Sequence, residues 1–255
     1  GDITAELVPV EHEATATVIC RQHATLCGEP WVNAVFNQVD PDIQVEWQQH
    51  DGDSVNPQDV IFIVRGKARS LLTAERTALN FLQTLSSVAT SAKTLADKVI
   101  HTGVKILDTR KTIPGLRLAQ KYAVQVGGCS NHRIGLFDAF LIKENHIAAA
   151  GSLTSAIERA RARGTGLFLQ VEVETLEQLE AALSVGVDGI LLDNMDDQTL
   201  RAAVVQARGR AMLEASGNMT GERIARLADS GLDRVSMGGL IHQARWVDLS
   251  MRLSA

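Results

Sequence analysis

Charged and small polar residues follow each of six apolar runs beyond Gly103 in this 255-residue chain. Stretches with helical periodicity separate the runs, which span residues 104–107, 139–142, 167–173, 189–192, 211–213 and 232–235. This alternation is typical of parallel strands, which are buried on both faces and enter their loops at one edge of the sheet. In α/β barrels the active site lies at that edge, so we expect the six polar strand ends to converge on one pocket.

The polar residues at these strand ends divide by charge. Basic side chains come early in the region, at Arg110, Lys111, His132, Arg133 and Lys143. Acidic side chains follow on later strands, at Glu172 and Asp193. One polar strand end needs no function, because every chain must leave its core. Six ends with this division of charge favour a small polyanion held beside a divalent metal ion.

Two glycine-containing turns follow the last two runs, Ser216-Gly217-Asn218 and Gly238-Gly239. Turns of this kind can aim backbone N–H groups at a phosphate. Glycine after a strand also forms tight turns without any ligand, so each turn alone is weak evidence. Their place on the last two strands favours phosphate binding, because barrel enzymes often bind phosphate there.

The elements that must position these residues follow from periodicity. Residues 5–70 alternate in short segments such as 14–20 and 43–47, which predicts a half-exposed, mainly antiparallel sheet. Residues 71–100 have helical spacing and predict one long helix or two abutting ones. Later helices have readable ends, from Thr175 to Gly186 and from Thr220 to Gly231. The chain beyond Gly103 is therefore expected to form a parallel α/β barrel or a doubly wound sheet.

Composition excludes several classes of protein. A net charge of −5 disfavours a nucleic-acid scaffold, which needs a broad excess of Lys and Arg. Three cysteines without a CxxC pair support neither a disulfide framework nor a structural zinc site, so we expect a reducing cytoplasm. No apolar run is long enough for a membrane span. The chain begins at Gly1 rather than Met, and we expect a further segment to precede it.

Several motifs together resemble the signature of the quinolinate phosphoribosyltransferase family. The principal ones, in the family's order and spacing, lie at residues 108–115, 131–136 and 141–146. The likeness continues through 75–80, 171–174, 191–194 and 214–218 and so covers essentially the whole chain. The chain departs from the family's usual alanine and threonine at Gly239 and Ile241.

This resemblance implies a fold and an activity. The expected subunit is α/β, with an N-terminal α+β open-sheet domain followed by an incomplete parallel α/β barrel. We place the first domain at residues 1–86 and the barrel at 87–240, with 241–255 packing back on the first domain. The implied enzyme joins quinolinate to phosphoribosyl pyrophosphate (PRPP) with loss of CO₂, giving nicotinate mononucleotide for NAD biosynthesis. It also implies Mg²⁺ and a homodimer with shared active sites.

The resemblance also assigns roles to single residues. The cationic pocket for the quinolinate carboxylates and PRPP phosphates would comprise Arg76 of the neighbouring subunit with Arg110, Lys111, His132, Arg133 and Lys143. Glu172 and Asp193 would contact the ribose hydroxyls and the Mg²⁺–pyrophosphate group, and with Lys111 they would be the catalytic residues. The 5-phosphate would bind Ser216, Gly217, Asn218, Gly238 and Gly239.

Three other functions compete with this interpretation. One is a paralogous phosphoribosyltransferase-like protein of molybdenum-transport operons, and another is a nicotinate phosphoribosyltransferase, which binds one carboxylate instead of two. The third is a non-catalytic anion-binding protein. Glu172 and Asp193 disfavour the third, because a pure anion binder gains nothing from added negative charge.

Overall fold

The computed structural model describes residues 1–254 and divides the chain into two compact units. Unit 1 comprises residues 1–94, 119–128 and the chain from 243 onward, and unit 2 comprises residues 95–118 and 129–242. Helix α2 (Ala68–Val99) runs without a break across residue 86, so the domain limits expected from the sequence stay a prediction. The helix predicted over residues 71–100 is confirmed, and it is one continuous helix of 32 residues.

Unit 1 contains a four-stranded antiparallel sheet in the order β12-β1-β5-β3. Its strands are β1 (Glu13–Cys20), β3 (Gln44–Trp47), β5 (Val60–Lys67) and β12 (Leu249–Ser254), and β2 (Ala24–Thr25) pairs with β4 (Ser54–Val55). In β1 the alternate residues Ala16, Val18 and Cys20 are fully buried, which is the expected pattern for a strand with one covered face. The strands predicted near residues 14–20 and 43–47 are confirmed.

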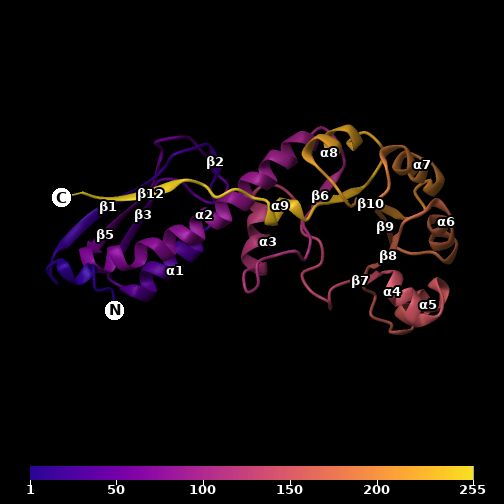
Figure 1. Cartoon of the computed structure of the whole chain (residues 1–255), viewed down its shortest axis with the longest axis horizontal. Coiled ribbons are helices and arrows are strands. Elements are labelled where there is room, and N and C mark those ends of the chain that lie inside the picture. The colour runs from indigo at the N-terminus through magenta and orange to yellow at the C-terminus, as the bar shows by residue number, and fades with distance from the viewer. Residues whose placement is uncertain (255) are drawn as a thin grey trace. The chain divides into compact units, whose positions relative to one another are not determined.

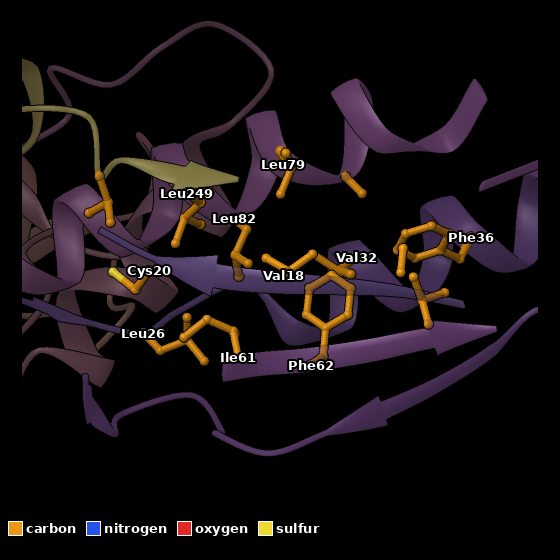
Figure 2. Close-up of a cluster of buried hydrophobic side chains, with 14 of the residues drawn as sticks. Val18, Cys20, Leu26, Val32, Phe36, Ile61, Phe62, Leu79, Leu82 and Leu249 are labelled. Carbon is orange, nitrogen blue, oxygen red and sulfur yellow. The ribbon is translucent and has the colours of Figure 1, made fainter. Parts of the chain in front are cut away.

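Helix α1 (Glu29–Val39) and the first part of α2 pack on the buried residues of this sheet. In Figure 2, Val32 and Phe36 of α1 and Leu79 and Leu82 of α2 point into the same cluster as Val18. The alternating pattern of residues 5–70 indicates strands and does not locate α1, although the family resemblance implies an N-terminal domain of sheet and helices. The signals for α1 are Pro30 in the first turn and the four-residue spacing of Val32 and Phe36. A short 3₁₀ turn, η1 (Ala5–Leu7), precedes β1.

Unit 2 is built on a six-stranded parallel sheet in the order β6-β11-β10-β9-β8-β7 (Figure 1). The strands are β6 (Lys105–Leu107), β7 (Phe140–Ile142), β8 (Leu169–Val173), β9 (Gly189–Asp193), β10 (Met212–Ser216) and β11 (Arg234–Ser236). Each overlaps one of the six apolar runs, although β10 continues three residues beyond its run, to Ser216, and β6 and β7 are the two edges. The predicted α/β class, with an antiparallel part followed by an incomplete parallel barrel, is confirmed.

Helices lie between successive strands of this sheet, and one more, α9, follows β11. They are α3 (Arg117–Val126), α4 (Glu144–Ala150), α5 (Leu153–Ala162), α6 (Leu176–Val185), α7 (Asp197–Ala207), α8 (Gly221–Leu227) and α9 (Gly239–His242). Thr175 and Thr220 cap α6 and α8 as predicted, since their hydroxyls accept from Gln178 N and Arg223 N. Gly186 ends α6. Helix α8 ends before the predicted Gly231, because Ser230 N bonds to Leu227 O in a tighter turn.

None of the helices in residues 1–254 combines the length and the apolar character that a membrane crossing requires.

Candidate active site

Strand register brings several of the predicted polar residues to one face of the parallel sheet. Residues paired across neighbouring strands point to the same face, and so do residues two apart on one strand. Leu191 of β9 pairs with Glu172 of β8 on one side and with Glu214 of β10 on the other. Two residues further along these strands, Asp193 pairs with Ser216. The parallel strands therefore present carboxylates and a hydroxyl in two adjacent rows at their carboxyl ends.

Lys143 joins this arrangement from the edge strand β7. Its Nζ donates to Glu172 Oε2 in a direct ion pair, and Glu172 is mostly buried there. The backbone of Lys143 is held as well, because its N–H donates to His146 Nδ1 at 3.0 Å in the first turn of α4. A lysine predicted to contact quinolinate thus touches a carboxylate predicted to serve the ribose side.

His132 is enclosed by other protein groups. Its backbone N–H donates to the fully buried Asp108 Oδ1 at 2.8 Å, and its ring Nδ1 accepts from Arg133 N at 2.7 Å. A ring nitrogen that accepts carries no proton, so in this geometry the proton lies on Nε2. That atom is 3.3 Å from Glu214 Oε1. The role predicted for His132 in binding a carboxylate stays a prediction.

Glu214 is fully buried inside the sheet of unit 2. Its Oε2 accepts from Gln170 Nε2 at 3.0 Å. Burial by itself raises the pKa of the Glu214 carboxyl, but His132, Gln170 and Ser236 outweigh burial and hold that pKa below its usual value. Glu214 is therefore an anion at neutral pH and places a fixed negative charge beside His132.

The remaining cations lie on loops. Arg110 and Lys111 are exposed after β6, whereas Arg133 is half-buried. Burial and the neighbouring Arg110 charge both lower the pKa of Arg133. Two guanidinium groups close enough to repel each other prepare a site for an anion.

Arg117 fastens the loop after β6 to the loop that carries Arg133. Its guanidinium donates to Thr112 Oγ1 at 3.2 Å, to Ile134 O at 3.2 Å and to Arg110 O at 3.4 Å. One side chain therefore spans both cationic loops.

The turn after β10 packs tightly against the turn after β9. Asn194 N donates to Ser216 O at 3.0 Å, and Asn218 Nδ2 lies 3.4 Å from Asn194 Oδ1. Gly217 has φ +89°, and a Cβ there would lie 2.2 Å from Asn194 Oδ1. Only glycine fits this position, since it tolerates both the left-handed backbone and the close approach.

The second predicted phosphate turn lies against Lys111. A Cβ on Gly238 would come within 2.9 Å of Lys111 Cδ, so the glycine leaves room for the aliphatic part of that lysine. Gly239 begins the four-residue helix α9. This contact brings Lys111 to the turn after β11.

Arg76 is the one predicted site residue in unit 1. It is exposed on α2, and Glu75 Oε1 lies 3.8 Å from its Nη2. The other twelve predicted residues belong to unit 2.

Comparison with known proteins shows which family this chain belongs to. The models for the C-terminal and N-terminal domains of quinolinate phosphoribosyl transferase match residues 88–252 and 2–86. The chain belongs to the quinolinate phosphoribosyltransferase family.

Named relatives of the family are similar along almost the whole chain. A probable nicotinate-nucleotide pyrophosphorylase [carboxylating] of Bacillus subtilis is 37% identical over 98% of this chain and 87% of its own. Quinolinate phosphoribosyltransferase [decarboxylating] 1b of Nicotiana tabacum is 35% identical over 99% of this chain and 77% of its own. The solved nicotinate-nucleotide pyrophosphorylase of Francisella tularensis superposes with a TM-score of 0.96 at 44% identity, covering 100% of this chain and 90% of that one.

Three buried polar residues of this family member had no role assigned to them from the sequence, although two of them, Asp108 and Glu214, stand among the polar strand ends: Asp108, Gln170 and Glu214. They hold His132 or each other. A signal for two of them was present, because Gln170 and Glu214 are polar residues inside apolar strands. Each stands two residues before another predicted site residue, Glu172 or Ser216, and so shares its face.

Proposed function

We propose that this chain transfers the phosphoribosyl group of PRPP to quinolinate, with release of pyrophosphate and CO₂, and so makes nicotinate mononucleotide. The observation that carries the proposal is the ion pair between Lys143 and Glu172. It joins a cation suited to a substrate carboxylate with a carboxylate suited to the ribose. Two substrates bound on either side of this pair would be neighbours, as a direct transfer between them requires.

The cationic loops would bind and orient quinolinate. The planar fork of an arginine holds a carboxylate by two parallel hydrogen bonds, which a lysine cannot reproduce. Arg110 and Arg133 are close enough for like-charge repulsion, which two substrate carboxylates would relieve. Their role is to place the pyridine nitrogen in line with C1 of the ribose.

The transfer proceeds as the bond between C1 and the pyrophosphate oxygen breaks and a bond from the pyridine nitrogen to C1 forms. The ribose then has oxocarbenium character, which nearby carboxylates stabilise. Glu172 and Asp193 lie on neighbouring strands and suit this role. Lys111, whose stem lies against Gly238, would neutralise the departing pyrophosphate.

Loss of CO₂ follows from the charge on the alkylated ring. The pyridinium nitrogen draws the electron pair of the adjacent C–C bond as that carboxylate leaves, and the ring carbon then takes a proton. The protein contributes alignment and fixed charge, and the step needs no covalent nucleophile.

Mg²⁺ is the expected cofactor, and the donor set fits it. Mg²⁺ usually binds through substrate phosphates, water and one or two carboxylates. Residues 1–254 contain no cluster of three or more His, Cys, Asp or Glu side chains that could hold a metal ion. Glu172 and Asp193 would instead hold Mg²⁺ indirectly, through PRPP and water, and the ion would neutralise pyrophosphate charge.

We further propose that the protein acts as a cytoplasmic homodimer in which Arg76 serves the active site of the neighbouring subunit. The exposure of Arg76 and its place in unit 1 support this arrangement. No bound nucleic acid or membrane is required for this activity.

Product analysis tests the main proposal. Incubation with quinolinate, PRPP and Mg²⁺ should yield nicotinate mononucleotide, pyrophosphate and CO₂ in equal amounts. Nicotinate should be a poor substrate, because a site built for two carboxylates leaves charged groups unpaired when one is missing. Comparable kcat/KM values for the two acids would favour nicotinate phosphoribosyltransferase, and binding without turnover would favour an anion-binding protein.

Substitution separates the two substrate sites. Glu172→Ala and Asp193→Ala should each lower turnover strongly while quinolinate still binds in calorimetric titration. Loss of quinolinate binding in a folded variant that keeps PRPP binding would reverse the assignment.

Mixed dimers test the sharing of sites. Arg76→Ala and Lys111→Ala should each be inactive alone. After random subunit exchange about half of the dimers are mixed, and each has one intact site, so activity should return to about a quarter of the wild-type value. An inactive mixture, with exchange confirmed by mass spectrometry, would reject the shared site.

A further inference from the structure

The Arg223 side chain donates hydrogen bonds to the turns after β9 and β10. This side chain is only 14% exposed, and its Nε donates to Asp197 Oδ1 at 2.7 Å. The other two guanidinium nitrogens donate to backbone carbonyls, Nη1 to Gly217 O at 3.1 Å and Nη2 to Met195 O. One charged group therefore binds a carbonyl in each of the two turns.

These contacts set the direction of the neighbouring N–H groups. In a trans peptide the C=O and the following N–H point to opposite sides. Because Arg223 draws Gly217 O toward itself, the N–H of Asn218 points away from Arg223. Within residues 1–254 no hydrogen bond uses that N–H.

The same turns have backbone conformations that need support. Asn194 and Asn218 have φ values of +54° and +49°, and Gly217 has φ +89°. Positive φ values are unfavourable for residues with a side chain and persist where surrounding contacts enforce them. The contacts of Arg223 reach both turns and also a helix, through Asp197 of α7.

We infer that Arg223 is a positioning residue for the 5-phosphate of PRPP: it fixes the Ser216-Gly217-Asn218 turn so that a backbone N–H faces the phosphate. This inference rests on the proposed function. Arg223 does not touch the phosphate, and its charge is already neutralised by Asp197, so it acts through peptide orientation. The planar guanidinium is required, because three donors in a fixed fork reach one carboxylate and two carbonyls together.

Inhibition by ribose 5-phosphate and by pyrophosphate, the two parts of PRPP, separates binding of the 5-phosphate from binding of the pyrophosphate group. Arg223→Met removes the contacts to both carbonyls while keeping a long apolar stem. The KM for PRPP and the Ki of ribose 5-phosphate should each rise about tenfold, the loss expected from charge-assisted hydrogen bonds. The Ki of pyrophosphate and the Kd of quinolinate should stay within twofold, because those groups bind elsewhere.

Arg226→Met is the matched control. Arg226 contacts the same Asp197, with Nη2 3.4 Å from Oδ2, but it is 62% exposed and donates to neither turn. This variant should leave all four constants unchanged. Equal effects from both substitutions would show that Asp197 matters rather than the two carbonyls, and would overturn the inference.

Arg223→Lys covers the case in which Arg223→Met does not fold. Lysine can keep the ion pair with Asp197 but concentrates its donors at one atom, so the KM for PRPP should rise by an intermediate factor. A wild-type KM in this variant would reject the need for the fork. A parallel rise for ribose 5-phosphate and pyrophosphate would indicate general loosening and reject the inference. Wild-type protein inactive with quinolinate and PRPP would instead refute the proposed function.

Discussion

The loops after β6 and β7 present their charge on long side chains, whereas the turns after β9 and β10 present polar backbone. Arg110 and Lys111 are exposed, and Arg117 fastens their loop through bonds of 3.2 to 3.4 Å. The turns after β9 and β10 are more closely packed. Gly217 has no space for a Cβ, and Arg223 Nη1 donates to Gly217 O at 3.1 Å.

This difference suits the two kinds of ligand. Quinolinate has two carboxylates at fixed angles, and flexible cations can adapt to them. A phosphate presents three equivalent oxygens, which a rigid ring of backbone N–H groups can bind without much side-chain entropy. The two regions should therefore respond differently to substitution, with the turn sensitive to backbone changes and the loops sensitive to loss of charge.

Of the substitutions that test this difference, Gly217→Ala should have the largest effect. The new Cβ meets Asn194 Oδ1 and the backbone is strained, so kcat/KM for PRPP should fall about 100-fold, equivalent to about 2.7 kcal/mol. Gly209→Ala is the control, because Gly209 also has positive φ (+73°) but its Cβ would meet nothing within 4 Å. Steady-state kinetics and thermal unfolding should be measured for both. Equal losses would mean that strain alone, and not the packing of the two turns, determines the effect.

Lys143→Met should come next and should act on the other substrate. Removing the charged hydrogen-bond donor should lower kcat/KM for quinolinate about 30-fold. Lys105→Met, an exposed change at the opposite end of the strands of this sheet, should leave kinetics unchanged. Calorimetric titration with quinolinate separates binding from turnover. Unaltered quinolinate kinetics in Lys143→Met would remove this lysine from the site.

Glu214→Gln should show a smaller effect that depends on pH. The pKa of the Glu214 carboxyl is lowered in the folded protein, so its anion stabilises the fold above the unfolded pKa of about 4.3. The variant should lose about 1 to 3 kcal/mol of unfolding free energy at pH 7. The difference in unfolding free energy between wild type and variant should narrow as pH falls below about 4.3, because the wild-type carboxyl then takes up a proton, first in the unfolded state and at lower pH in the folded state. Urea unfolding at several pH values measures this difference in unfolding free energy, and the exposed Glu144→Gln is the control. A difference that does not change with pH would contradict the lowered pKa of Glu214.

Asn218→Gly should have the smallest effect. Glycine adopts the φ of +49° readily, and the side-chain contact to Asn194 is long at 3.4 Å. If the backbone N–H binds the phosphate, the KM for PRPP should change less than about threefold, a range typical of near-neutral substitutions. A tenfold rise in initial-rate assays would show that the amide side chain itself recognises the substrate.

Local patterns were sufficient for much of the fold. The six strands, the caps at Thr175 and Thr220 and the glycine at 217 each depend on signals within a few residues. The same local patterns did not locate helix α1. Its 11 residues lie among alternating segments, and its only buried apolar residues are Val32 and Phe36. The end of α8 also differed, since helix ends depend on one or two backbone bonds.

The sequence by itself determined which chemical groups stand at the strand ends and, through the family motifs, which family the chain belongs to. Only the tertiary structure decided which of these groups meet. Gln170 and Glu214 are 44 residues apart, and Arg223 reaches Met195 across 28. Such contacts follow from the strand order β6-β11-β10-β9-β8-β7 and from side-chain reach across it. No local periodicity encodes that order, because periodicity reports which face a residue takes and not which strand lies beside it.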